Sequence, residues 1–181
     1  MHGLGSFYGI DLSGGVNFDV YYNTLIEDHS FNAFGGVFTM ASGSGNVVKN
    51  NLIVSRLGVT AVSKNTASTS ESDYNNIYTA GERYYKIDNT IYQNLDSVQE
   101  NTSYEQNSQD IYPIMNTLYE PYHQSPWLNG AGTPVPEVTE DIDGNPRDSN
   151  NPDIGCTEYT PDPTTTTPMS GIYTVGTGGD T

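Results

Sequence analysis

The turn at residues 141–147 (DIDGNPR) is the part of the sequence best equipped to hold a metal ion. Asp141, Asp143 and Asn145 alternate along it and place three oxygen-bearing side chains close together. Oxygen ligands of this kind are those that Ca²⁺ prefers. The later ligands and the bidentate Glu of a full calcium loop are missing. We therefore favour a structural turn over a calcium site, and we expect no other cofactor.

Tyrosines form a second candidate site, for carbohydrate. The chain holds 14 of them, and Tyr21, Tyr22, Tyr74 and Tyr78 fall at or near predicted strands. A tyrosine that faces outward from a flat sheet can stack on the apolar face of a sugar ring. In the alternative interpretation, the same rings point inward or cover the sheet. The pattern supports both interpretations equally.

A repeat indicates which elements position these side chains. The runs VYYNTLI, VKNNLIV and DYNNIY carry Asn23, Asn51 and Asn76 before a β-rich stretch, at spacings of 28 and 25 residues. A period in the twenties is typical of stacked β coils. An Asn at the same corner of each coil is expected to form a ladder that bonds backbone groups of the turn.

A second pattern interleaves with the first. Gly9, Gly36 and Gly58 open the runs GIDL, GVFTM and GVTAV, at spacings of 27 and 22 residues. Apolar residues alternate along these runs as they do in strands. Two strand types in fixed order predict an all-β solenoid. The alternative is an antiparallel β-sandwich with Asn-rich turns.

Composition excludes some partners. The formal net charge of the 181 residues is −16, from 22 acidic and 6 basic residues. Nucleic acid is disfavoured because phosphate contacts need clustered Lys and Arg. No segment approaches the apolar length of a membrane span. Residues 95–108 are the best candidate for a helix.

The chain divides into four predicted regions. Residues 1–93 carry the coils, and residues 94–160 lose the repeat and are expected to cap and close the stack. Residues 161–168 form a Pro/Thr linker, and residues 169–181 start a following β module. Because the repeat already runs at Gly9, we expect the natural N-terminus upstream, so a missing signal peptide says nothing about the compartment.

An ordered series of motifs resembles one family. The motifs are SDYN at 72–75, SPWLNGAG at 125–132, DIDGNPR at 141–147, PDIG at 152–155 and the pair Glu158-Tyr159. Over roughly residues 5–160 they resemble the C-terminal part of right-handed parallel β-helix proteins, pectin-lyase-like in fold and of the bacterial choice-of-anchor Q domain type. Cys156 and Asp73 depart from the pattern, since a small and an aliphatic residue are usual there.

The resemblance implies a right-handed parallel β-helix with an irregular C-terminal cap. It also implies that the turn at 141–147 is structural, with Arg147 paired to a nearby carboxylate. The function expected from it is that of a non-catalytic, adhesin-like module, secreted or on the bacterial cell surface. Such a module would contact extracellular polysaccharide and belong to a longer multi-domain chain.

The alternative function is the C-terminal part of a polysaccharide lyase or glycoside hydrolase with its active site upstream. Glycoside cleavage needs two carboxylates that face one sugar bond, and Asp11, Asp19 and Glu27 could line such a face. The paired Asp motifs and the Gly-His-Gly of β-helix polygalacturonases are absent, and no arginine lies in a lyase motif. Asp28-His29 is the most site-like pair, although on a solvated turn such a pair is usually inert. The sequence therefore leans away from an enzyme.

Overall fold

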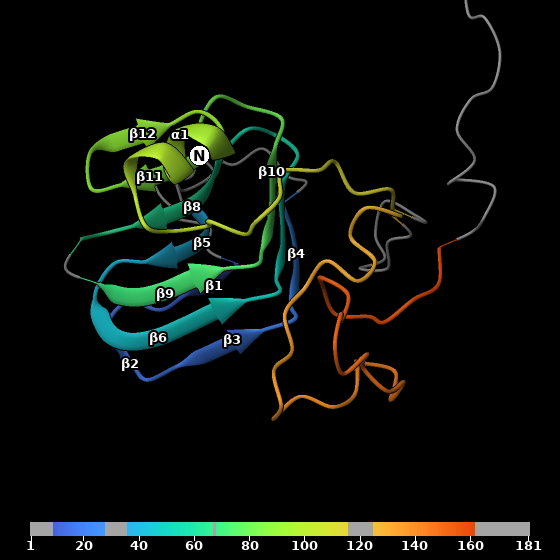
Figure 1. Ribbon diagram of the computed structural model, residues 1–181. Helices are drawn as coiled ribbons and strands as arrows, with labels where there is room; N and C mark the ends of the chain where they lie inside the picture. Colours follow the sequence, from blue (N-terminus) through green and yellow to red (C-terminus); the bar gives the residue numbers. More distant parts are fainter. Residues whose placement is uncertain (1–8, 28–35, 67, 116–124, 162–181) are drawn as a thin grey trace, which may run out of the picture.

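The computed structural model describes residues 9–27, 36–66, 68–115 and 125–161, which are mostly β-strand with one short helix (Figure 1). The predicted all-β class is therefore confirmed. The strands are β1 (Ile10–Asp11), β2 (Gly15–Val16), β3 (Asp19–Tyr21), β4 (Thr24–Glu27), β5 (Gly36–Met40), β6 (Gly43–Lys49), β7 (Leu52–Ser55), β8 (Thr60–Lys64), β9 (Thr69–Asp73), β10 (Asn76–Thr79), β11 (Tyr85–Ile87) and β12 (Thr90–Tyr92). The helix α1 spans Leu95–Asn101. Within the described residues, no helix has the length and apolar character that crossing a membrane requires.

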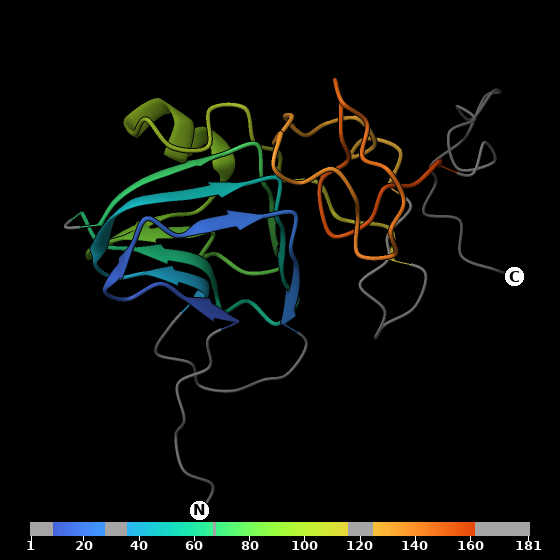
Figure 2. The same ribbon diagram turned by 90° about the horizontal axis from the view of Figure 1, so that it is seen from below.

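Three sheets are built from successive segments of the chain. Sheet 1 has the order β1-β5-β8-β11-β12, sheet 2 places β6 between β9 and the pair β2 and β3, and sheet 3 has the order β10-β7-β4. All of these pairings are parallel except that of β11 with β12. Figures 1 and 2 show the three sheets facing one another around a common interior, with residues 125–161 beside sheet 3.

The core consists of aliphatic and aromatic rows that run across the strands. In sheet 1, Phe38 pairs with Val62, which pairs with Tyr85, and all three are buried. In sheet 3, Ile53 lies between Leu25 and Ile77. These rows pack into one cluster between the sheets, which a single segment could not bury alone.

The observed register corrects the predicted repeat. The spacing of 28 residues holds for the first step, because Thr24 pairs with Leu52. In the second step Asn76 pairs with Leu52, so Asn75, not Asn76, is the equivalent of Asn51. A slip of one residue would turn the buried Ile77 away from the core, and such a slip is costly wherever one face is buried.

The glycine pattern does not follow the register either. Gly36 pairs with Thr60, and Ile10 pairs with Phe38, so Gly9 and Gly58 do not occupy the position of Gly36. Packing of the apolar residues sets the alignment here, and the glycines occupy different places in the turns.

The predicted asparagine ladder is present at the corner between sheets 2 and 3. The backbone N–H of Asn23 donates to Asn51 Oδ1 at 2.9 Å, and that of Asn51 donates to Asn75 Oδ1 at 2.9 Å. The side-chain amides repeat both links at 3.0 Å. Each ladder residue follows a left-handed residue, at φ angles of 56°, 60° and 56° for Tyr22, Asn50 and Tyr74. The ladder thus supplies partners for a corner that cannot pair as a strand.

Residues after the strands bond to the last segment. The helix predicted over 95–108 is shorter and ends at Asn101, with Asn94 as its N-cap. The backbone N–H of Glu105 donates to Ser72 O, and that of Gln109 donates to Asn75 O, both at 2.9 Å. These bonds satisfy the carbonyl groups at the edge of sheets 2 and 3.

Candidate functional site

The four predicted tyrosines do not share one face. Tyr21 lies on β3 in sheet 2, Tyr78 lies on β10 in sheet 3, and Tyr22 and Tyr74 occupy left-handed corners. Tyr78 packs edge-on against Tyr112, with ring centroids 5.0 Å apart. Tyr22 is only 5% exposed and donates from its hydroxyl to Thr133 O at 3.0 Å. Its buried ring has no free face, so Tyr22 is unsuited to stack a sugar.

The outer face of sheet 2 presents Tyr21 among charged side chains. Val20, Val48 and Ser72 form the buried row of this sheet. Because side chains alternate along a strand, the neighbouring rows point outward. One row is Asp19, Val47 and Glu71, and the other is Tyr21, Lys49 and Asp73.

Contacts within these outward rows hold the charged groups in place. Lys49 Nζ lies 2.6 Å from Glu71 Oε1. Burial, together with a hydrogen bond to Asp19, raises the pKa of Tyr21 to about 12. Asp73 accepts from the backbone and side-chain amides of Asn107 at 2.6 and 2.7 Å. The face therefore combines an aromatic ring with ordered hydrogen-bonding groups.

The acidic turn is organised around one carboxylate. Asp141 Oδ1 accepts from the backbone N–H groups of Asp143 and Asn145 at 2.9 and 2.8 Å. Its Oδ2 accepts from Asn145 Nδ2 at 3.1 Å and from the backbone N–H of Glu158 at 2.9 Å. Burial raises the pKa of Asp141, but these donors together lower it further, so the net shift is downward. Among the described residues, no three His, Cys, Asp or Glu side chains group as metal ligands.

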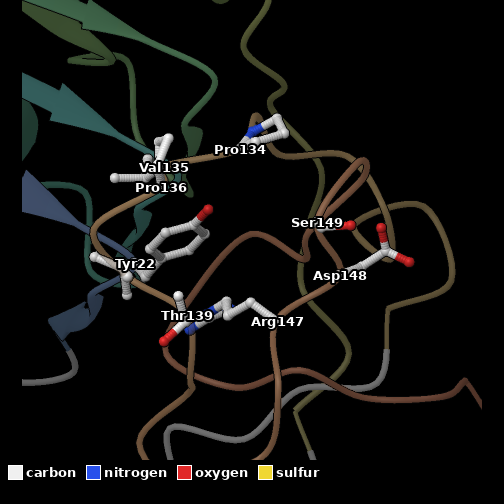
Figure 3. A pocket seen from close by; sticks show the side chains of 9 residues that line it. Tyr22, Pro134, Val135, Pro136, Thr139, Arg147, Asp148 and Ser149 are labelled. Carbon is white, nitrogen blue, oxygen red and sulfur yellow. The ribbon is translucent and has the colours of Figure 1, made fainter.

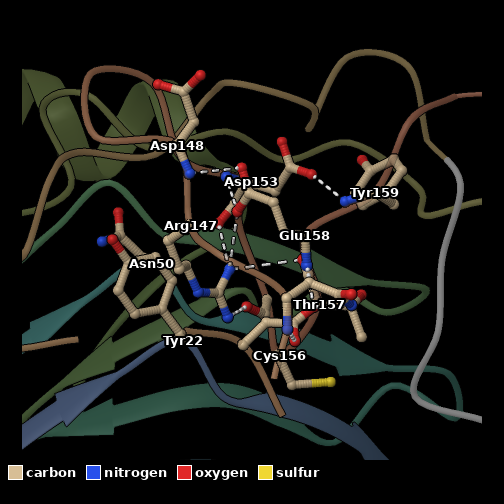
Figure 4. A network of polar contacts seen from close by, with 12 residues as sticks. Tyr22, Asn50, Arg147, Asp148, Asp153, Cys156, Thr157, Glu158 and Tyr159 are labelled. Atoms are coloured by element: carbon tan, nitrogen blue, oxygen red, sulfur yellow. Dashed lines mark hydrogen bonds and ion pairs between the residues drawn. The ribbon is translucent and has the colours of Figure 1, made fainter. Parts of the chain in front are cut away.

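A buried arginine joins this turn to the strands, as Figure 4 shows. The Nη1 atom of Arg147 lies 3.3 Å from Glu158 Oε2, so the expected pairing with a carboxylate is present. Its Nη2 donates to Gly155 O at 3.0 Å. The guanidinium carbon lies 4.0 Å from the centroid of the Tyr22 ring, a cation–π contact. Arg147 therefore links residues 139–158 to the corner of sheets 2 and 3.

The carboxylates around Arg147 are engaged on every side. Asp153 Oδ1 accepts from Gly130 N at 2.6 Å, and its Oδ2 accepts from Tyr159 N at 2.7 Å. Glu158 accepts from the backbone N–H groups of Asp148 and Asp153 at 3.1 and 3.2 Å. Burial raises the pKa of both Asp153 and Glu158, and the bonds to backbone donors and the charge of Arg147 only partly offset it.

A pocket of about 280 Å³ opens between this network and the strands (Figure 3). It is lined by Tyr22, Pro134, Val135, Pro136, Val138, Thr139, Arg147, Asp148 and Ser149. The segment that forms one wall is held to the corner by Thr133, which exchanges two hydrogen bonds of 2.8 Å with the Asn50 side chain. The pocket is missed by the sequence prediction, where this stretch is only a Gly- and Pro-rich loop.

A buried glutamate is the second feature that the sequence did not reveal. Glu105 is fully buried at the end of the asparagine ladder. Its carboxylate accepts from Ser72 Oγ at 2.5 Å, Ser108 Oγ at 2.6 Å and Asn75 Nδ2 at 3.1 Å. Burial raises the pKa of Glu105, and these three donors offset part of that effect. The run at 102–108 carries no repeat that would mark it as a ladder cap.

Some predicted features lie outside the described residues. They are the pair Asp28-His29, most of the Pro/Thr linker at 161–168 and the following module at 169–181. For the chain as a whole, no protein-family model, no curated protein and no solved structure gives a match.

Proposed function

We propose that the chain is the C-terminal part of a right-handed parallel β-helix of the pectin-lyase-like, choice-of-anchor Q type. Support comes from the parallel pairing of strands from successive segments, 28 and then 24 residues apart. Stacked coils produce this pattern, because each coil adds one strand to every sheet. The asparagine ladder and its cap at Glu105 fit the closing turns of such a stack.

The module is non-catalytic and adhesin-like, is secreted or displayed on a bacterial cell surface, and belongs to a longer multi-domain chain. It contacts extracellular polysaccharide. One observation carries the contact: the outward rows of sheet 2 set Tyr21 beside Lys49 and within one row of Asp19 and Glu71. An aromatic ring flanked by charged hydrogen-bonding groups suits a sugar ring, which is apolar on its faces and polar at its edge.

The surroundings of this face leave room for a chain-like ligand. Figures 1 and 2 place α1 and residues 125–161 beside the other parts of the molecule and away from the outward side of β3 and β6. Glu71 is 59% exposed at its side chain. Since the chain carries a net charge of −16, we expect neutral polysaccharides to bind better than acidic ones.

Affinity electrophoresis in gels that contain neutral or acidic polysaccharides tests the proposal. We expect a neutral polysaccharide to retard the chain, and Tyr21→Ala to weaken the retardation about threefold to tenfold, as the loss of one stacking ring predicts. Tyr112→Ala, which removes an exposed ring near sheet 3, is the matched control and should change nothing.

Two results would overturn the proposal. Retardation by none of the polysaccharides, or retardation that is unaffected by Tyr21→Ala and lost with Tyr112→Ala, removes the contact from sheet 2. Release of reducing ends or unsaturated products by this chain would contradict a non-catalytic module. Cleavage by a longer parent protein alone would favour a lyase or hydrolase with its active site upstream.

A further inference from the structure

The pocket beside Arg147 has two chemically different sides. Pro134, Val135 and Pro136 give one apolar wall, and the Tyr22 ring lies opposite them in Figure 3. Thr139, Ser149 and Asp148 bring polar groups to the other side. A ligand that fills this pocket must therefore be apolar on a face and polar at its edge.

One polar atom in the wall lacks a partner. Arg147 Nε is buried and finds no hydrogen-bond acceptor among the described residues, although both terminal nitrogens of the same guanidinium are engaged. A buried donor without an acceptor costs about 1–3 kcal/mol. An oxygen of a ligand in the pocket would recover that cost, so the site favours a ligand with an acceptor at its edge.

Charge argues for a neutral ligand. The positive charge of Arg147 is already balanced by Glu158 at 3.3 Å and lies over the Tyr22 ring. Asp148 lines the same pocket, and backbone donors from Asn151 and Asn150 lower its pKa, which keeps this exposed carboxylate ionised. An anionic ligand would meet this carboxylate and gain no free positive charge in return.

Size limits the ligand further. Drug-sized ligands occupy pockets of about 300–1,000 Å³, whereas this one measures about 280 Å³. It suits a single ring. We infer that this pocket binds one ring of a neutral sugar, with its apolar face on the proline wall and an oxygen accepting from Arg147 Nε. The site is separate from the sheet 2 face and goes beyond the polysaccharide contact proposed there.

Saturation-transfer NMR on the whole chain tests this inference with the methyl glycosides of glucose, galactose, mannose and N-acetylglucosamine. We expect transfer to at least one of them. Ser149→Trp fills the pocket from its rim and should weaken binding at least tenfold. Asn150→Trp makes the same change one residue away, outside the lining, and should leave binding within twofold.

A second measurement reads the proposed bond directly. The Nε–H resonance of Arg147 should shift when the bound glycoside is added, because it gains an acceptor, and it should not shift in Ser149→Trp. If a glycoside binds but Ser149→Trp is without effect, or if the Nε–H resonance stays unchanged, the inference is wrong. If no glycoside binds while polysaccharide still retards the chain through Tyr21, the pocket inference fails and the proposed function stands.

Discussion

Arg147 shows how much a single side chain can hold together. Its side chain is 4% exposed, and that of its partner Glu158 is 16% exposed. It also bonds to the Gly155 carbonyl and stacks on Tyr22. A charge so buried is costly unless every contact is satisfied, so the turn, the Asp153 loop and the strand corner depend on one guanidinium.

Arg147→Ala should destabilise the chain by about 3 kcal/mol or more, because it leaves Glu158 partly buried without its counter-ion. Lys49→Ala is the matched control, since it breaks the exposed pair with Glu71 and should cost about 0–1 kcal/mol. Urea unfolding followed by tyrosine fluorescence measures both. Equal losses in the two variants would contradict the structural role of Arg147.

Glu105 should make stability depend on pH in a defined direction. Its pKa is raised in the folded chain by burial, which the bonds from Ser108, Ser72 and Asn75 offset only in part. A raised carboxyl pKa stabilises the fold fully below the unfolded value, near 4.5, and this contribution is lost as pH rises through the folded pKa.

The comparison with Glu105→Gln isolates that effect. Over the interval between the two pKa values, the free energy of unfolding of the natural chain should fall relative to the variant by up to about 1.4 kcal/mol per pH unit. Urea unfolding at a series of pH values measures the difference. A difference that is constant, or that grows with pH, would show that the Glu105 pKa is not raised.

Asp141 separates the structural interpretation of the acidic turn from the calcium interpretation. All four of its printed hydrogen bonds come from N–H donors within residues 143–158. Asp141→Asn should cost about 1–3 kcal/mol, because an amide nitrogen cannot accept from Glu158 N. Excess Ca²⁺ should leave thermal unfolding of the natural chain unchanged relative to a chelator. A site saturated at about 100 times its Kd would instead add about 2.7 kcal/mol.

At the scale of elements, the asparagine ladder fixes the corner between sheets 2 and 3. Asn51 is fully buried, and its Nδ2 donates to Val20 O and Lys49 O at 2.9 Å and to Asn75 Oδ1 at 3.0 Å. Asn23 stands at the end of the ladder and is half-buried. The middle rung therefore satisfies backbone groups that water cannot reach.

Asn51→Ala should cost about 3 kcal/mol or more, since it leaves several buried backbone groups without partners at about 1–3 kcal/mol each. Asn23→Ala should cost clearly less, because its corner is reached by solvent. Urea unfolding gives both values, and hydrogen exchange at the Asn23 amide, which donates to Asn51 Oδ1, should speed up in Asn51→Ala. A larger loss in Asn23→Ala would overturn this order.

The ladder also shows how far a sequence can predict this fold. The spacing of Asn23 and Asn51 and the β-rich runs after them revealed the all-β class and the first register step. The second step was missed by one residue, because Asn75 and Asn76 are adjacent and only the burial of Ile77 decides between them. Glycines were poor guides, since turns of different length place them differently.

The site was less predictable for a related reason. Arg147 and its carboxylate partner were expected from the motif that carries them, and they are close in sequence. Tyr22, Asn50 and Thr133 meet across more than 80 residues, and no periodic pattern connects them. The pocket and the burial of Tyr22 both depend on that long-range contact, so they could not be foreseen.

At the scale of the whole molecule, sheet 3 is buried on both faces. Ile53 on β7 points into the core between the sheets, whereas its neighbours Leu52 and Val54 pack with Leu128 and Ile154 of the C-terminal segment. A strand with both faces covered reads as a continuous apolar run, and LIV at 52–54 is such a run. The C-terminal segment is thus part of the fold's second core.

Leu128→Ala tests whether that second core stabilises the whole chain. Leu128 is fully buried, so the cavity left behind should cost about 2–5 kcal/mol. Ile142→Ala is the matched control, because Ile142 is 67% exposed and a surface change should stay within about 0.5 kcal/mol. If the segment and the sheets unfold as one unit, Leu128→Ala lowers the urea midpoint of every tyrosine and of Trp127 together. If Trp127 alone responds, the segment unfolds by itself, and sheet 3 is stable without its outer cover.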